Sequence, residues 1–161
     1  MERTLKKHLI SLNVNGEDHE AYVYPHKSLL DTVRDELRLT GSKKGCDEGD
    51  CGACTMFLDG KPVTSCLVLA VDAVDRKVTT IEGLADGTRL SPVQQAFVDH
   101  GSIQCGFCIP GLIMSGTALL NENANPTEED IRLAIGNNIC RCTGYSKVVE
   151  AIMAAAANYP R

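Results

Sequence analysis

The chain has 161 residues, enough for one ordinary domain or two small ones, and with 43% hydrophobic and 23% charged residues it can supply a packed core. Its net charge of −5 and its lack of a basic–aromatic stripe argue against nucleic acid as the partner. No secretory signal and no run of about 18 apolar residues is visible, so the sequence predicts a cytoplasmic protein without a membrane span.

Strand patterns open the chain. Apolar and polar residues alternate over 10–14 and again over 21–23, and Asn15-Gly16 between them is a strong signal for a tight turn. Ser28 can then cap a helix that Thr40-Gly41 ends. The sequence therefore predicts a β-hairpin followed by one helix.

A long loop comes next, followed by short strands. The loop shows no hydrophobic period over about fifteen residues, and a loop of that length inside a compact domain is usually functional or disordered. After it, alternation and turn signals predict three short strands, at 56–58, 63–67 and 78–81.

Helical signals replace strand signals after Glu82-Gly83. Serine, threonine and proline residues that favour helix starts predict four helices, opening at Ser91-Pro92, Pro110, Pro126-Thr127 and Ser146. We therefore predict an α+β fold with two domains, the first from residue 1 to 82 and the second, all-helical, from 83 to 161.

Eight cysteines are unusual in such a chain. An even count can indicate a disulfide scaffold, but that interpretation requires a secretory route and a domain too small for a core. Metal or redox chemistry is the better interpretation. The spacing separates the cysteines into two sets of four: Cys46, Cys51, Cys54 and Cys66, then Cys105, Cys108, Cys140 and Cys142.

The first set has the C-x4-C-x2-C spacing of plant-type 2Fe–2S ferredoxins, with a more distant fourth cysteine. Structural zinc is the main rival, but zinc sites usually pair two short knuckles, which this triplet does not resemble. Three glycines lie among these cysteines and allow the backbone to pass close to the sulfurs: Gly45, Gly49 and Gly52.

The second set, C-x2-C followed by C-x-C, is less diagnostic. Its spacing also suits zinc, and the C-x2-C part alone could be a redox dithiol. A second iron–sulfur cluster is favoured because two clusters make an electron chain. No nucleophile–base pair, phosphate loop or dinucleotide fingerprint is visible, so the sequence indicates an electron carrier without catalytic residues of its own.

Three segments, "GCDEGDCGACTMFLDG", "QCGFCIPG" and "CRCTGY", resemble the small iron–sulfur subunit of the molybdenum hydroxylases, the xanthine dehydrogenase, aldehyde oxidoreductase and carbon monoxide dehydrogenase family. The resemblance extends roughly from Leu9 to Ala157. It implies a β-grasp plant-type ferredoxin domain followed by a four-helix bundle, each with one 2Fe–2S cluster. It also implies that the two sets of four cysteines are the cluster ligands.

The resemblance further implies partners and an electron path. A large subunit would hold the molybdopterin cofactor and a medium subunit would hold FAD, in a heterotrimer or its dimer. In such enzymes the helical-domain cluster lies nearest the pterin, so Cys142 would sit against the pterin and Gln104 could hydrogen-bond to it. Electrons would pass from molybdenum through both clusters to flavin or an external acceptor, and the substrate would be chosen by the large subunit.

Two other functions remain open on the sequence. A freestanding two-cluster ferredoxin would be stable alone and acidic all round, and the net charge of −5 mildly favours it. A zinc-stabilised interaction module would be colourless, whereas a 2Fe–2S protein is red-brown.

Overall fold

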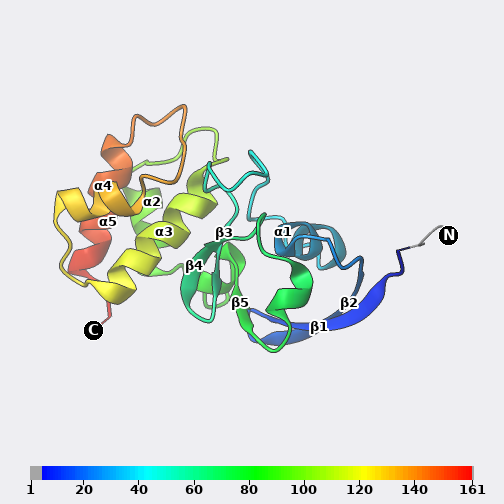
Figure 1. Cartoon of the computed structure of the whole chain (residues 1–161). Coiled ribbons are helices and arrows are strands. Elements are labelled where there is room, and N and C mark those ends of the chain that lie inside the picture. The colour runs from blue at the N-terminus through cyan, green and yellow to red at the C-terminus, as the bar shows by residue number, and fades with distance from the viewer. Residues whose placement is uncertain (1–4, 161) are drawn as a thin grey trace.

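The computed structural model describes residues 5–160, with strands gathered in the first half of the chain and long helices in the second (Figure 1). Five strands form one mixed sheet in the order β2-β1-β5-β3-β4. Their bounds are β1 His8–Val14, β2 Glu17–Val23, β3 Thr55–Leu58, β4 Lys61–Thr64 and β5 Lys77–Thr79. The α+β class predicted from the sequence is confirmed.

The β1–β2 hairpin forms where the sequence predicts it. Asn15 and Gly16 both take positive φ angles, 55° and 86°, as a two-residue hairpin turn of the favoured hand requires. The alternating apolar side chains of β1 and β2 point into the core, whereas the polar ones between them face solvent. β5 pairs with β1 in parallel and with β3 in antiparallel orientation, and so joins the hairpin to β3 and β4.

The helix predicted to run to Thr40 is shorter and less regular than expected. Ser28 caps it as predicted, since its side chain accepts a hydrogen bond from the backbone N–H of Asp31. α1 covers only Leu29–Asp31 and continues as a π-helical turn, η1, over Thr32–Glu36. Arg38, with φ of 62°, then turns the chain away from the helix axis.

Two predicted strands also have different bounds. β4 ends at Thr64 instead of continuing to Leu67, because the backbone N–H of Leu67 bonds back to the Thr64 carbonyl in a turn. β5 ends at Thr79, because the N–H of Thr80 donates to the side chain of Asn15 instead of a neighbouring strand. Two short 3-10 turns, η2 (Ala70–Ala73) and η3 (Ile81–Leu84), flank β5.

Between residue 83 and residue 160 the structure has four α-helices: α2 Pro92–Asp99, α3 Ile109–Glu122, α4 Glu128–Ala134 and α5 Ser146–Ala157. Ser91 and Thr127 form capping boxes at the starts of α2 and α4, in agreement with the sequence. Ser146 does not cap α5. The residue before the first turn is Tyr145, which adopts a left-handed conformation and makes no side-chain cap.

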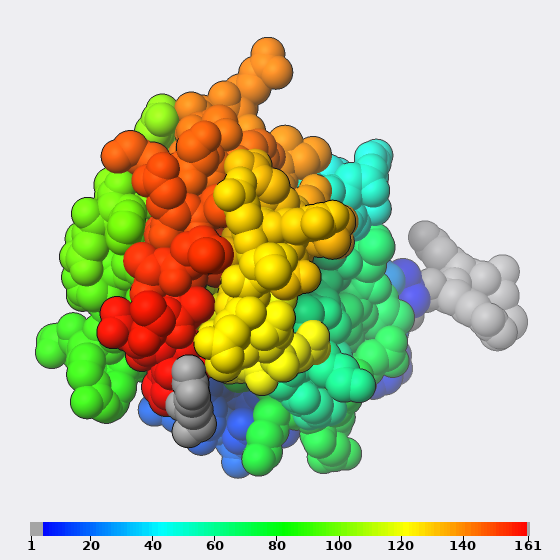
Figure 2. Space-filling view, turned by 90° about the vertical axis from the view of Figure 1, so that its left-hand side faces the viewer, coloured from blue at the N-terminus to red at the C-terminus, as the bar shows by residue number. Residues whose placement is uncertain are grey.

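The buried apolar residues form three clusters. One apolar cluster fills the space between the sheet and α1, and another lies among α2–α5. Phe57 of β3 packs with Met114 and Ala118 of α3 in a third cluster, which brings the sheet into contact with the helical half. Figure 2 shows the helical half from outside. There α5 lies in the middle, with α2 on one side and α4 and the end of α3 on the other. In residues 5–160, no helix combines the length and apolar character needed to span a membrane.

Candidate metal centres

Three loops at the top of Figure 1 carry most of the cysteines. Cys46, Cys51 and Cys54 lie between η1 and β3, and Cys66 follows β4. We call these four the N-terminal group. Cys105 and Cys108 precede α3, and Cys140 and Cys142 lie between α4 and α5. These four form the C-terminal group. The two groups correspond to the two sets of four that the spacing separates.

Within the N-terminal group the thiols come together as pairs. The Cys51 thiol lies near enough to the Cys46 thiol to affect the pKa of Cys46, and the Cys54 thiol neighbours that of Cys66 in the same way. All four are free cysteines, and Cys54 is buried with only 2% of its surface exposed. The loop before β3 and the turn after β4 thus together present two thiol pairs.

Backbone N–H groups point at the sulfur of Cys46. The N–H groups of Glu48 and Cys51 lie 3.3 and 3.4 Å from it, and they lower the pKa of the Cys46 thiol to about 7. In contrast, burial and the neighbouring thiol of Cys54 raise the pKa of Cys66 to about 12. The loop therefore already favours a thiolate at Cys46, as a metal ligand requires.

Glycine is needed in this loop for close approach of the backbone. A β-carbon on Gly45 would stand 2.6 Å from the Cys51 sulfur, and Gly49 has a φ of 88° that other residues rarely adopt. Gly52, also expected to leave room for sulfur, has a different neighbour. A β-carbon there would overlap Asn138 of the helical half.

Two polar anchors hold the loop, and sequence reasoning missed both. Lys44 forms ion pairs with Asp31 at 3.0 Å and with Asp47 at 2.9 Å. The Ser65 hydroxyl donates to the carbonyl of Cys54 at 2.6 Å. The Lys44–Asp31 and Ser65–Cys54 contacts fix the loop to α1 and to the end of β4, and these partners are 13 and 11 residues apart, too far for a spacing rule to reveal them.

The C-terminal group forms two pairs as well. The thiols of Cys108 and Cys140 lie close enough to affect each other's pKa, and the thiol of Cys105 neighbours that of Cys142 closely enough to affect the pKa of Cys142. Burial raises the pKa of Cys108 to about 12. Burial also acts on Cys140, but hydrogen bonds from the hydroxyl of Thr143 at 3.1 Å and from its backbone N–H at 3.4 Å outweigh it and lower the pKa of Cys140 to about 7.

The two pairs of the C-terminal group differ in depth. Cys108 is 6% exposed and Cys140 is half-buried, whereas Cys105 and Cys142 are exposed. Gln104, which precedes Cys105, is also exposed. The outer pair and Gln104 therefore lie on the surface, where a partner can reach them.

The pairing matches the chemistry of a binuclear cluster. A 2Fe–2S cluster takes two thiolates on each of two irons, whereas one zinc ion needs four ligands around a single point. Two pairs of thiols in each group, with N–H groups directed at sulfur, fit a 2Fe–2S cluster in each.

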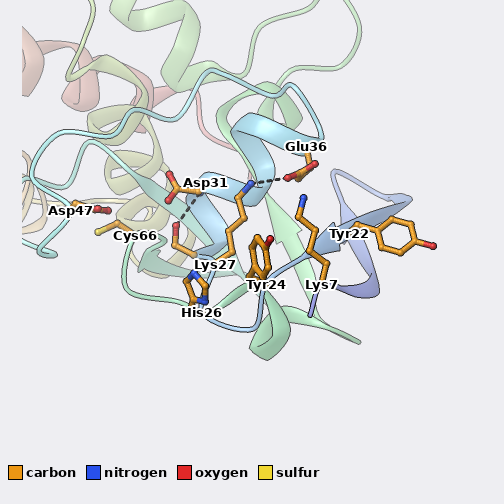
Figure 3. Close-up of a pocket in the computed structure, with 10 residues that line it drawn as sticks. Lys7, Tyr22, Tyr24, His26, Lys27, Asp31, Glu36, Asp47 and Cys66 are labelled. Carbon is orange, nitrogen blue, oxygen red and sulfur yellow. Dashed lines mark hydrogen bonds and ion pairs between the residues drawn. The ribbon is translucent and has the colours of Figure 1, made fainter. Parts of the chain in front are cut away.

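A hollow opens beside the N-terminal group (Figure 3). It has a volume of about 420 Å³ and extends from Cys66 and Asp47 to Tyr24 and Lys7. The Tyr24 ring stacks on the His26 ring with 5.6 Å between their centroids. The Lys7 ammonium lies over the Tyr24 ring, 5.4 Å from its centroid. Solvent thus reaches the Cys66 side of the N-terminal group.

Hydrogen bonds also connect the loops of the two groups. The backbone N–H of Ile139 donates to the Cys51 carbonyl at 3.0 Å, and the Asn138 side chain donates to the Gly52 carbonyl at 2.9 Å. Sequence reasoning assigned no role to Asn138. The only feature of the sequence that could have pointed to Asn138 is that it is a polar residue two positions before Cys140.

Comparisons with known proteins agree with this geometry. Residues 10–100 match a family described as 2Fe-2S iron-sulfur cluster binding domain, and residues 80–153 match one described as [2Fe-2S] binding domain. The chain is 45% identical over 148 residues to the nicotinate dehydrogenase small FeS subunit of Eubacterium barkeri, covering 92% of this chain and 94% of that subunit.

Solved structures extend the likeness to the fold. Quinoline 2-oxidoreductase from Pseudomonas putida 86 matches with a TM-score of 0.91 and 40% identity, over 94% of this chain and 95% of the matched one. The aldehyde oxidoreductase from Desulfovibrio gigas matches with a TM-score of 0.87 and 45% identity, over 92% of this chain but only 17% of the longer one.

The fold, the thiol pairs and the matched domains define a protein with two 2Fe–2S clusters. Its relatives place it more narrowly: the chain belongs to the small iron–sulfur subunits of the molybdenum hydroxylase family. It is thus the electron-transfer subunit of a multi-subunit oxidoreductase.

Proposed function

We propose that electrons enter this chain at the C-terminal group, cross to the N-terminal group and leave beside Cys66. A 2Fe–2S cluster accepts and releases one electron at a time, and its potential depends on hydrogen bonds to sulfur and on exposure to solvent. The observation that carries the proposal is the arrangement of eight free thiols as four pairs in two adjoining groups.

Each thiol pair would hold one iron. Cys46 with Cys51 and Cys54 with Cys66 are the pairs of the N-terminal group; Cys105 with Cys142 and Cys108 with Cys140 are those of the C-terminal group. The groups would belong to separate units, a β-grasp ferredoxin-type unit over residues 1–82 and a four-helix bundle over residues 83–161. The five-stranded sheet and helices α2–α5 support this division.

The entry side would face the large molybdopterin-binding subunit. Cys105 and Cys142 are exposed there, and so are apolar residues close to them in the sequence: Ile103 is 43% exposed, Phe107 48% and Ile139 62%. An exposed apolar rim around a redox group suits a surface that is covered in a complex. Cys142 and Gln104 would then lie against the pterin, with the Gln104 amide available for a hydrogen bond.

The exit side would face the acceptor. The hollow beside Cys66 gives access to the N-terminal group, and Leu67 and Leu69 next to it are 61% and 39% exposed. A medium FAD subunit would cover this face in a heterotrimer or its dimer. The chemistry on the substrate would take place on the large subunit, in the cytoplasm.

Two cysteine variants of the complete complex test the order of transfer. With Cys54→Ser we expect loss of the cluster signal of the N-terminal group, reduction of the other cluster by substrate, and almost no turnover with the acceptor. With Cys105→Ser we expect the opposite: the cluster of the N-terminal group is intact, but substrate does not reduce it. Electron paramagnetic resonance (EPR) spectra after substrate addition distinguish these states.

Normal turnover by Cys54→Ser would refute the relay. Metal analysis of the native complex provides the second check, since two 2Fe–2S clusters per molybdenum give about four iron atoms per molybdenum. Iron without molybdenum or a stable large partner would instead indicate a freestanding two-cluster ferredoxin.

A further inference from the structure

The two groups of thiols are joined by one direct backbone contact. The Cys51 carbonyl accepts the N–H of Ile139 at 3.0 Å, and Cys140 is the next residue along the chain. A continuous line of bonds therefore runs from the Cys140 sulfur through the backbone to Ile139, across this hydrogen bond, and through Cys51 to its sulfur. Covalent and hydrogen bonds carry electronic coupling better than a gap of the same length.

Asn138 holds this contact in place. The residue is 2% exposed, and its amide donates to the Gly52 carbonyl, which neighbours Cys51, at 2.9 Å. Its side-chain oxygen accepts from the Ser115 hydroxyl of α3 at 2.6 Å. One buried amide thus connects the loop of the N-terminal group, the loop of the C-terminal group and the helix α3.

Tyr145 closes the same loop from the other end. Its hydroxyl accepts from the Cys140 N–H at 2.7 Å and donates to the Asn138 carbonyl at 3.0 Å. The loop from Asn138 to Cys140 is therefore fixed on both sides of Ile139. The Ile139 side chain is exposed, so its backbone, and not its side chain, makes the contact with Cys51.

Glycines allow the two loops to approach so closely. β-carbons on Gly52 and on Gly111 of α3 would both overlap the Asn138 amide, and the one on Gly111 would also overlap the Gly52 carbonyl. The loops meet backbone to backbone, with the Asn138 amide filling the space between them. Few other side chains could fit there and still donate to Gly52.

We propose that the Ile139–Cys51 hydrogen bond is the bridge for electron transfer between the two clusters, and that Asn138 is the residue that positions it. This inference rests on the proposed function. In the step, one electron leaves the cluster of the C-terminal group, which is oxidised, and reduces the cluster of the N-terminal group. No covalent bond forms or breaks and no proton moves.

The test uses the complete enzyme complex with Asn138→Ala and Asn138→Asp. Aspartate keeps the size of the side chain and an acceptor for Ser115, but as a carboxylate it has no N–H to offer Gly52. After mixing with substrate and rapid freezing, EPR spectra follow the reduction of each cluster separately. We expect reduction of the N-terminal cluster to slow by roughly tenfold, because transfer rates depend steeply on how the partners are positioned.

Three further readouts separate positioning from a structural effect. Iron content and both EPR signals should stay complete, and the two midpoint potentials should not move. The magnetic splitting between the two reduced clusters should weaken, since it reports their mutual coupling. Asn137→Ala makes the same change one residue earlier, at an exposed side chain, and should reproduce the wild-type rate and splitting.

A wild-type rate in both fully loaded Asn138 variants would overturn the inference. If these variants lose a cluster, Ser115→Ala decides the matter, because it removes only the hydroxyl that orients the Asn138 amide. A slower reduction of the N-terminal cluster in Ser115→Ala than in wild type, by less than tenfold, supports the bridge. A wild-type rate in this variant overturns it. If the wild-type N-terminal cluster is never reduced through the other one, the proposed function itself fails.

Discussion

Replacing Gly111 by alanine is a test in which helix propensity predicts a more stable protein and packing predicts a less stable one. The residue lies in the first turns of α3, where replacement of glycine by alanine normally stabilises a helix by about 1 kcal/mol. Here, however, the added β-carbon would overlap a backbone carbonyl, that of Gly52, and the Asn138 amide that donates to it. The carbonyl belongs to the backbone, and the Asn138 amide is buried and held by hydrogen bonds to Gly52 and Ser115, so neither can shift easily.

The magnitude follows from three contributions. Forcing an extra methyl group into a packed site costs about 1–3 kcal/mol, and weakening a buried hydrogen bond costs about 1 kcal/mol more. The gain in helix propensity offsets about 1 kcal/mol of this. We expect Gly111→Ala to be destabilised by roughly 2 kcal/mol, which lowers the melting temperature by about 4–8 °C in a chain of this size.

Gly116→Ala is the matched control, because it makes the same change in the same helix. A β-carbon there would stand 3.0 Å from the terminal methyl group of Ile152, a side chain that can shift. Its stability should stay within about 1 kcal/mol of wild type. The assay is thermal unfolding of the cluster-loaded chain at a fixed scan rate. A Gly111→Ala protein as stable as Gly116→Ala would refute the packing argument.

Three other predictions concern sulfur, a helix cap and acid stability. Thr143→Val removes a hydroxyl that donates to the Cys140 sulfur, so an EPR-monitored redox titration should show a lower potential for the cluster of the C-terminal group and an unchanged potential for the other cluster. A C-terminal cluster with the same potential in the variant as in wild type would contradict this. Thr127→Ala should destabilise the chain by about 1 kcal/mol in thermal unfolding, and Thr127→Ser should restore it. The ion pair with Arg76 lowers the pKa of Asp59 below its usual 3.8. At neutral pH wild type should therefore be more stable than Asp59→Asn, and this difference should disappear as the pH falls below 3.8 and Asp59 is protonated. A difference in stability that does not change with pH would count against the ion pair.

Local signals explain what the sequence could predict. The Asn15-Gly16 turn, the capping boxes at Ser91 and Thr127, and the spacing within each cysteine set all depend on residues a few positions apart. The α+β class follows from the change of hydrophobic period near residue 83. These features do not need the rest of the molecule, so short-range chemistry is enough to identify them.

Long-range contacts explain what it could not. The contact of Asn138 with Gly52 joins residues 86 positions apart, and no local pattern distinguishes this asparagine from a surface one. The helix after Ser28 was predicted too long because Arg38 adopts a left-handed conformation that is not evident from its residue type. Gly52 was expected to face sulfur, but its neighbour belongs to the other half of the chain.

The position of β2 at the edge of the sheet matters before the complex assembles. Only β1 pairs with β2 among residues 5–160, so one row of its backbone N–H and C=O groups faces outward. Glu17, Asp18 and Glu20 lie along this strand and are mostly solvent-exposed. Two copies pairing edge to edge would bring these like charges together. A newly made chain waiting for its clusters and its partner subunits is thereby protected against forming β-aggregates with its own kind.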